Sequence, residues 1–160
     1  MDERALTRLL EQVRSGKTQV RDAVSRLKDL PFAELGYATL DTHRALRFGM
    51  PEVVLGESKT VEQLFGIFGV LAARKQTVLV TRLQPVKAES LVARYPKGTY
   101  HAEARIFELR HGRARRRGTV AVVTAGTSDI PVAEEAAITA AAMGAKVRRV
   151  FDVGVAGIHR

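Results

Sequence analysis

Residues 119–153 read TVAVVTAGTSDIPVAEEAAITAAAMGAKVRRVFDV, and this stretch decides the fold. Two largely apolar, β-branched runs, Thr119–Thr124 and Val147–Val153, flank an alanine-rich segment that Pro131 opens and Gly144 closes. Apolar runs without alternation are typical of strands buried on both faces of a parallel sheet. Proline in the first turn and glycine after the last turn indicate the two ends of a helix. The order predicts a right-handed βαβ unit.

The loop between the first strand and the helix is the candidate binding site. Ligands of open α/β sheets bind at the carboxyl ends of the strands, and a helix N-terminus favours phosphate. Gly126 permits close backbone approach, Thr127 and Ser128 add hydroxyl donors, and Asp129 can accept from a ribose hydroxyl. Ser128 or Asp129 could equally serve only as a helix cap. The residues alone leave both interpretations open.

The preceding residues predict a mixed α/β domain that begins with a helical hairpin. Thr60 and Gln63 form a capping-box pattern, and Gly66 and Gly69 predict the close approach of another backbone to the helix that follows. Residues 35–59 read as loop, apart from a short charged helix before Gly49 and one strand. The expected helices are 6–13, 18–30, 60–75 and 85–95, and the expected strands are 52–55, 77–83 and 99–110.

A basic segment separates the two parts. Arg113, Arg115, Arg116 and Arg117 lie between two glycines, so we place domains at 1–117 and 118–160. Residues 1–118 carry the whole net charge of +9. The segment lacks interleaved aromatic residues and any recognised module, which favours a solvated hinge over nucleic-acid binding. The fold class is α/β: a mixed α/β N-terminal domain, then the first βαβ unit of an incomplete parallel-sheet, flavodoxin-like domain.

Composition excludes several classes of function. The chain has no cysteine, so these residues hold no disulfide, no thiolate metal ligand and no cysteine nucleophile. No apolar run reaches the roughly 20 residues of a membrane helix, and the charged N-terminus is unlike a secretory signal. We therefore expect a cytoplasmic protein without membrane contact. The four histidines lack metal-ligand spacing, although a Mg²⁺ ion that bridged substrate phosphates would leave no such signature.

Several motifs together resemble one family. Val120–Asp129 resembles the first strand and phosphate loop of the PurE-type aminoimidazole ribonucleotide carboxylases and mutases. The fuller resemblance is to the LarB family of nickel-pincer cofactor biosynthesis proteins, also known as circadian phase modifier or PurE-related proteins. It covers the chain from about Leu40 onward, and the residues that carry it are Leu40-Asp41, Arg44, Arg47, Gly49, Pro51–Val54, Lys59-Thr60, Thr81-Arg82, Thr124–Ala136 and Asp152–Arg160.

The resemblance implies a carboxylase and hydrolase. Such proteins carboxylate the pyridinium ring of nicotinic acid adenine dinucleotide and split its phosphoanhydride, which releases AMP and leaves a pyridinium biscarboxylate mononucleotide. CO2 or bicarbonate is the co-substrate, no tightly bound cofactor is expected, and the full protein is expected to form a homo-oligomer. The family's ring-attacking cysteine lies in the C-terminal half of its domain. We therefore expect this chain to be an inactive N-terminal portion of such an enzyme.

Individual site residues follow from the same resemblance. At the second loop position PurE enzymes have serine where this chain has Gly126, so one phosphate contact is absent. Ile158-His159-Arg160 is similar to an alanine-histidine-arginine run of PurE, but the longer intervening stretch makes His159 a weak proton shuttle and Arg160 a better nucleotide contact.

A charged group precedes the basic segment. Arg44, Arg47, Glu52 and Lys59 are candidates for binding phosphates or carboxylates, or for a paired scaffold. The open alternatives for the whole chain are a PurE-like carboxylase or mutase on another nucleotide, and a non-catalytic nucleotide-binding or regulatory protein.

Overall fold

The computed structural model describes residues 3–28, 32–42, 44–48, 50–112, 114 and 118–154, without the side chains of Leu46 and Arg47. A four-stranded sheet with the order β3-β4-β6-β5 lies at its centre. Its strands are β3 (Glu52–Leu55), β4 (Val78–Thr81), β5 (Thr99–His101) and β6 (Ile106–Leu109). β3 runs parallel to β4, whereas β6 is antiparallel to both β4 and β5. The predicted α/β class is confirmed.

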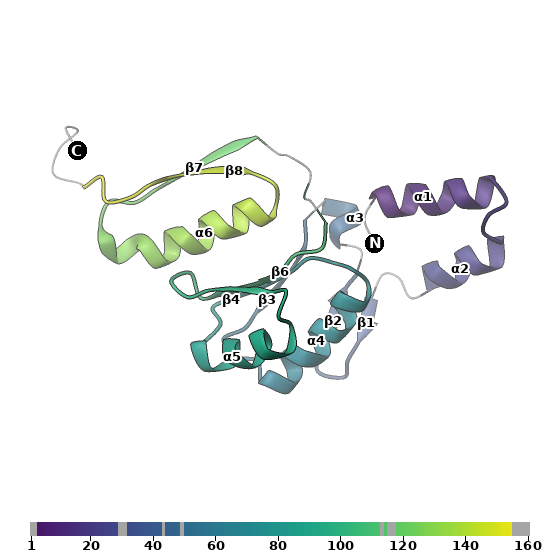
Figure 1. The fold of residues 1–160 in the computed structure, drawn as a ribbon, viewed down its shortest axis with the longest axis horizontal. Helices are drawn as coiled ribbons and strands as arrows, with labels where there is room; N and C mark the ends of the chain where they lie inside the picture. Colours follow the sequence, from purple (N-terminus) through teal and green to yellow (C-terminus); the bar gives the residue numbers. More distant parts are fainter. Residues whose placement is uncertain are drawn as a thin grey trace.

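Two helices cover one face of this sheet, α4 (Val61–Ala73) and α5 (Pro85–Arg94) (Figure 1). Phe68 of α4 is fully buried and packs edge-on against Phe107, with ring centroids 5.5 Å apart. The predicted capping box is confirmed, because Thr60 Oγ1 accepts from the Gln63 amide and Gln63 Oε1 accepts from the Thr60 amide. Both halves of this motif are local, so the sequence alone could specify it.

A third helix, α6 (Ile130–Ala142), covers the opposite face of the same sheet. Ile138 and Ala142 pack with Leu79 and Ile106 in a second core cluster. The other side of α6 packs against β7 (Thr119–Val123) and β8 (Lys146–Val150), so α6 lies between two sheets (Figure 1). Its alanines keep the helix thin enough for both contacts.

The β7 and β8 strands form the predicted parallel pair, with Val120 opposite Val147. The expectation that both strands are buried on both faces is wrong. Val123 is 57% exposed and Val150 is 43% exposed. The physical reason is that, in the part of the chain that the structure describes, α6 is the element that packs against β7 and β8. It covers one face of the pair, and the other face stays exposed.

The stretch expected to be mostly loop, residues 35–59, contains the strand β2 (Thr39–Asp41), which pairs with β1 (Phe32–Glu34) as a β-hairpin. The expected short helix follows as α3 (Arg44–Phe48). The Tyr37 hydroxyl at the hairpin tip donates to the Gln63 carbonyl and lies over Gly66, where a Cβ would overlap it. The expected close backbone neighbour is therefore a side chain, and at Gly69 a Cβ would meet nothing within 4 Å.

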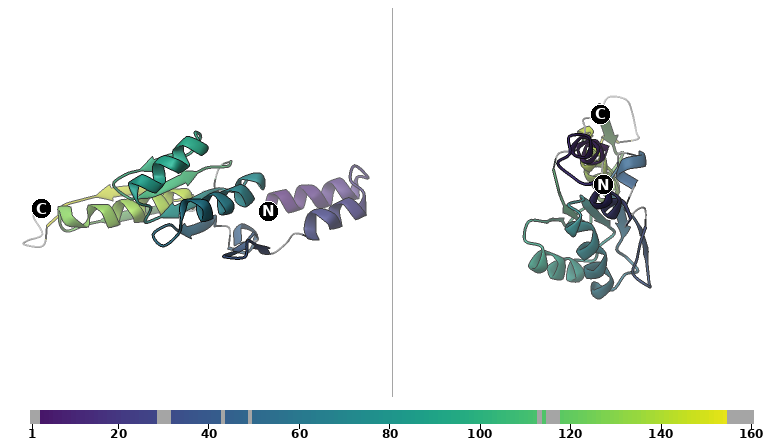
Figure 2. Two further views of the ribbon diagram at one scale, coloured as in Figure 1. Left: turned by 90° about the horizontal axis from the view of Figure 1, so that it is seen from below. Right: turned by 90° about the vertical axis from the view of Figure 1, so that its right-hand side faces the viewer.

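The predicted strand over residues 99–110 is two strands. β5 and β6 pair as a hairpin around a turn in which Arg105 has φ +52°. No Gly or Asn marks this turn, so the sequence signal for it was absent. The helices α1 (Glu3–Arg14) and α2 (Val20–Lys28) form the predicted hairpin at one end of the molecule (Figure 2). Within the described residues, no helix is long and apolar enough to cross a membrane.

Candidate functional site

The predicted phosphate loop lies at the carboxyl end of β7, where Thr127–Asp129 form a 3-10 turn before α6. Asp129 Oδ2 accepts from the Gly126 amide at 3.2 Å, and the Asp129 amide donates to the Gly126 carbonyl at 3.2 Å. Asp129 therefore caps this turn. Asp129 is also the N-cap residue of α6, but its side chain makes no cap hydrogen bond to that helix. Its bond to Gly126 engages one of the amides that a phosphate could use.

Thr124 and the segment after β8 hold this loop in place, a role that the sequence interpretation did not assign to them. Thr124 is buried, and its Oγ1 accepts from the Asp152 amide at 3.1 Å. The Gly154 amide donates to the Ala125 carbonyl at 2.7 Å. Asp152 has a left-handed φ of +55°, which turns the chain out of the sheet. The structural role of Thr124 could have been predicted from its position, because it is a polar residue at the end of an apolar strand.

Gly126 has no structural need to be glycine. Its φ of −133° suits any residue, and an added Cβ would meet only Ser128 Oγ, at 4.0 Å. Thr127 and Ser128 are exposed beside it. Because Gly126 has no side chain, a ligand can approach the backbone of this loop closely, as a phosphate-binding loop requires. His159 and Arg160 lie outside the described residues.

The second group of candidates lies at the start of β3. Glu52 Oε2 and Arg44 Nε are both buried and have no hydrogen-bond partner among the described residues. Burial raises the pKa of Glu52; the positive charge of Arg44 opposes this shift, and the negative charge of Asp41 adds to it. Arg44 also lies 5.9 Å from the centroid of the Phe48 ring. The side chain of Arg47 lies outside the described part of the chain.

Lys59 does not join that group. Glu52 is the first residue of β3, whereas Lys59 follows the carboxyl end of the strand, in the turn where its amide donates to the Gly56 carbonyl at 3.3 Å. Arg82 lies at the same carboxyl edge and is 3.8 Å from Glu57 Oε2. The Arg44–Glu52 group and the Lys59–Arg82 group therefore lie at opposite ends of β3, and a strand extends about 3.3 Å per residue. The structure thus brings together Arg44, Glu52 and Asp41, and places Lys59 elsewhere.

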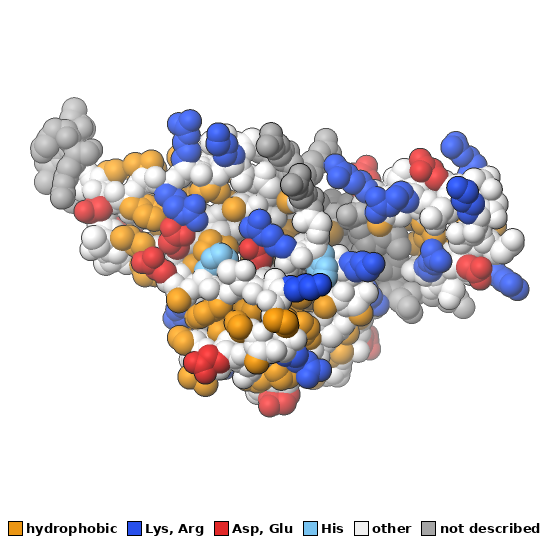
Figure 3. Space-filling model, viewed as in Figure 1, with side chains coloured by type: hydrophobic (Ala, Val, Ile, Leu, Met, Phe, Trp, Pro, Cys, Tyr) orange, Lys and Arg blue, Asp and Glu red, His pale blue; other side chains and the backbone are white. Residues whose placement is uncertain are grey.

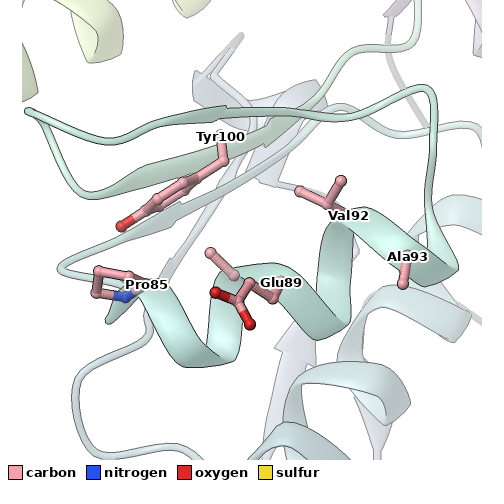
Figure 4. A pocket seen from close by; sticks show the side chains of 6 residues that line it. Pro85, Glu89, Val92, Ala93 and Tyr100 are labelled. Carbon is pink, nitrogen blue, oxygen red and sulfur yellow. The ribbon is translucent and has the colours of Figure 1, made fainter.

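A groove of about 390 Å³ lies between α5 and β5, and none of the predicted site residues that the structure describes is among its lining residues. The Tyr100 ring lies across it above Pro85 and Glu89 (Figure 4). Hydrophobic side chains gather on this part of the surface, whereas Lys and Arg side chains are spread over β7, β8 and the α1–α2 hairpin (Figure 3). Among the described residues, no group of three metal-ligating side chains occurs.

Comparison with known proteins identifies the family of this chain. An uncharacterized protein of Methanocaldococcus jannaschii is 34% identical over 128 residues, which cover 76% of this chain and 50% of that protein. The chain therefore spans about half the length of this relative. Residues 32–113, which include the four-stranded sheet and its two covering helices, match the model of the LarB/PurE-like N-terminal domain. The chain belongs to the LarB family, and it carries the N-terminal domain of that family.

Proposed function

We propose that this chain provides the nucleotide-binding part of a synthase that carboxylates nicotinic acid adenine dinucleotide and hydrolyses its phosphoanhydride to release AMP. The observation that carries the proposal is the open loop around Gly126, at the carboxyl end of a parallel strand pair in a chain of the LarB family. The reaction product would be a pyridinium biscarboxylate mononucleotide for nickel-pincer cofactor biosynthesis.

Each loop residue has a distinct role in the proposal. The Thr127 and Ser128 hydroxyls donate to the phosphate oxygens, and the start of α6 adds its positive dipole end. Asp129 keeps the Gly126 amide oriented through Oδ2, while its other carboxylate oxygen accepts from a ribose hydroxyl. Because the chain has no cysteine, these residues bind and orient the nucleotide and do not attack the ring.

The test is a calorimetric titration of the protein with nicotinic acid adenine dinucleotide. Gly126→Ala should weaken binding by about tenfold or more, because the new methyl group occupies the approach to the backbone while the fold has room for it. Gly69→Ala is the matched control, since its Cβ also meets nothing within 4 Å, and it should leave binding unchanged.

An aminoimidazole ribonucleotide separates the proposal from a PurE-like activity on another nucleotide. We expect it not to bind. If it binds more tightly than the dinucleotide, the substrate assignment is wrong and the PurE-like alternative gains. If Gly126→Ala binds the dinucleotide as well as the unchanged protein does, the loop around Gly126 does not bind the nucleotide and the proposal is wrong.

A further inference from the structure

The α1–α2 hairpin has one apolar face that is exposed. Leu9 and Ala23, at 4% and 6% exposed, are the buried residues of its two helices and face the partner helix. Leu10 and Val24 each follow one of them by one position, so each lies about 100° further round its helix. In antiparallel helices this rotation leads to the same face of the pair. That face therefore carries Leu10, Val24 and, one turn before Val24, Val20, which are 56%, 48% and 66% exposed.

The hairpin needs a covering surface of a particular kind. No other described element packs substantially on α1 or α2, and helices of 12 and 9 residues are marginal in water unless an apolar face is packed. Residues 3–28 carry seven Lys or Arg against three Asp or Glu, so two such hairpins repel each other. A surface that covers this face should therefore be apolar and carry negative charge.

The groove between α5 and β5 has both properties. Its walls are apolar except for Glu89, whose carboxylate lies beside the Tyr100 ring (Figure 4). The Tyr100 hydroxyl donates to the Leu83 carbonyl at 3.0 Å, which holds the ring in place as one wall. Val92, on the other wall, is 40% exposed. Among the described residues, no cation forms an ion pair with Glu89.

The spacing and charge of α2 match this groove. Val20 and Val24 are four residues apart, which is the spacing of the anchors by which an amphipathic helix binds a hydrophobic groove. Arg21 lies at the edge of the same face, and its side chain is 87% exposed beside Asp22 at 3.7 Å. Such an exposed pair contributes little, so Arg21 is available to a carboxylate at the rim of the groove.

We propose that the α1–α2 hairpin of a second copy of this chain docks in the groove between α5 and β5. Val20 and Val24 contact the apolar walls, and Arg21 pairs with Glu89. The hairpin lies at one end of the molecule, away from α5, so the two surfaces of one copy do not meet (Figures 1 and 2). Reciprocal exchange between two copies fills both grooves and gives a closed two-fold dimer.

The first experiment measures the dimer dissociation constant of the whole chain by sedimentation velocity over a range of concentrations. The unchanged protein should dimerise. Val24→Asp, Glu89→Lys and Arg21→Glu should each weaken the dimer by about tenfold or more, because they remove an anchor or a charge contact. All three positions are exposed, so far-UV circular dichroism should show an unchanged fold.

Charge exchange tests the assigned pair. The double variant Glu89→Lys with Arg21→Glu should recover most of the lost affinity, because it restores opposite charges in the reverse order. Arg26→Glu makes the same charge change on the other flank of α2, and Glu103→Lys makes it at an exposed residue outside the groove. Both controls should leave the dimer unchanged. Absence of recovery in the double variant would contradict the pairing of Arg21 with Glu89.

The second experiment tests proximity directly, since the natural chain has no cysteine. Val24→Cys and Val92→Cys are mixed under oxidising conditions, and the disulfides are identified by mass spectrometry of the digested protein. The bond between residues 24 and 92 should dominate. Val132→Cys, at 70% exposure on α6, replaces Val92→Cys as the control and should give no bond to residue 24 above background.

Three results would overturn the proposal. The first is a monomer at every concentration. The second is a dimer that Val24→Asp weakens and Glu89→Lys does not, with a 24–24 disulfide as the main product, because the hairpins would then pair with each other. The third is a dimer that none of the single variants weakens, because the interface would then lie elsewhere.

Discussion

At the scale of single residues, burial decides the chemistry of Glu52. A carboxylate in contact with an arginine ordinarily has a lowered pKa, but here burial outweighs the attraction of Arg44 and the pKa is raised. The proton is thus bound more tightly in the folded chain than in the unfolded chain. Sequence reasoning could pair an arginine with a glutamate but could not predict this direction, because it depends on how much water the fold removes.

Glu52 should therefore make stability fall as pH rises. Since the folded state holds the proton above the ordinary value of 4.5, the free energy of unfolding decreases as pH increases from that value through the raised pKa. Glu52→Gln cannot ionise and should lose this part of the pH dependence. Urea unfolding of both proteins between pH 4 and pH 8 measures it. A difference between the two proteins that stays constant over that range would contradict the assignment.

At the scale of elements, local signals set the ends of helices and the tertiary structure sets the partners of strands. The capping box of α4 was readable because Thr60 and Gln63 are three residues apart and each side chain accepts from the other's backbone amide. The hairpin of β1 and β2 was not readable, because each strand has three residues and pairs across a loop without a strong turn pair. β5 and β6 were read as one strand for the same reason.

Removal of the α4 cap should have a modest and measurable cost. Thr60→Ala deletes the oxygen that accepts from the Gln63 amide, which should lower the free energy of unfolding by about 1 kcal/mol. Gln63→Ala removes the reciprocal bond. Chemical denaturation of the two single variants and the double variant should show a double-variant loss smaller than the sum, because the two bonds form one motif. Strict additivity would mean that the two bonds are independent.

At the scale of the whole molecule, α6 joins two sheets. Its Ile138 and Ala142 pack on the four-stranded sheet, and Arg149 of β8 holds Glu134 on the helix through two hydrogen bonds. The proposed domain boundary at residue 117 stays a prediction, since the arginines that suggested it lie outside the described residues. The packing of α6 nevertheless couples residues 118–154 to the preceding sheet.

Truncation of Ile138 tests this coupling. Ile138→Ala should lower the free energy of unfolding by about 2–4 kcal/mol, because the residue is 7% exposed and its neighbours Leu79 and Ile106 are fully buried. Val132→Ala on the same helix, at 70% exposure, is the control and should have little effect. Hydrogen exchange should show faster exchange in β7 and β8 than in β4. Equal losses for the two variants would mean that α6 does not dock on the sheet.

The sequence by itself determined the local features: the helix caps, the βαβ unit with its glycine-containing loop, and the resemblance that the comparisons bear out at family level. These depend on neighbours a few residues apart. Only the tertiary structure decided which charges meet. It placed Arg44 and Asp41 beside Glu52 and put Lys59 beyond the other end of β3. The physical reason is that strand order, register and burial fix neighbours far apart in sequence, and no periodicity within one segment encodes them.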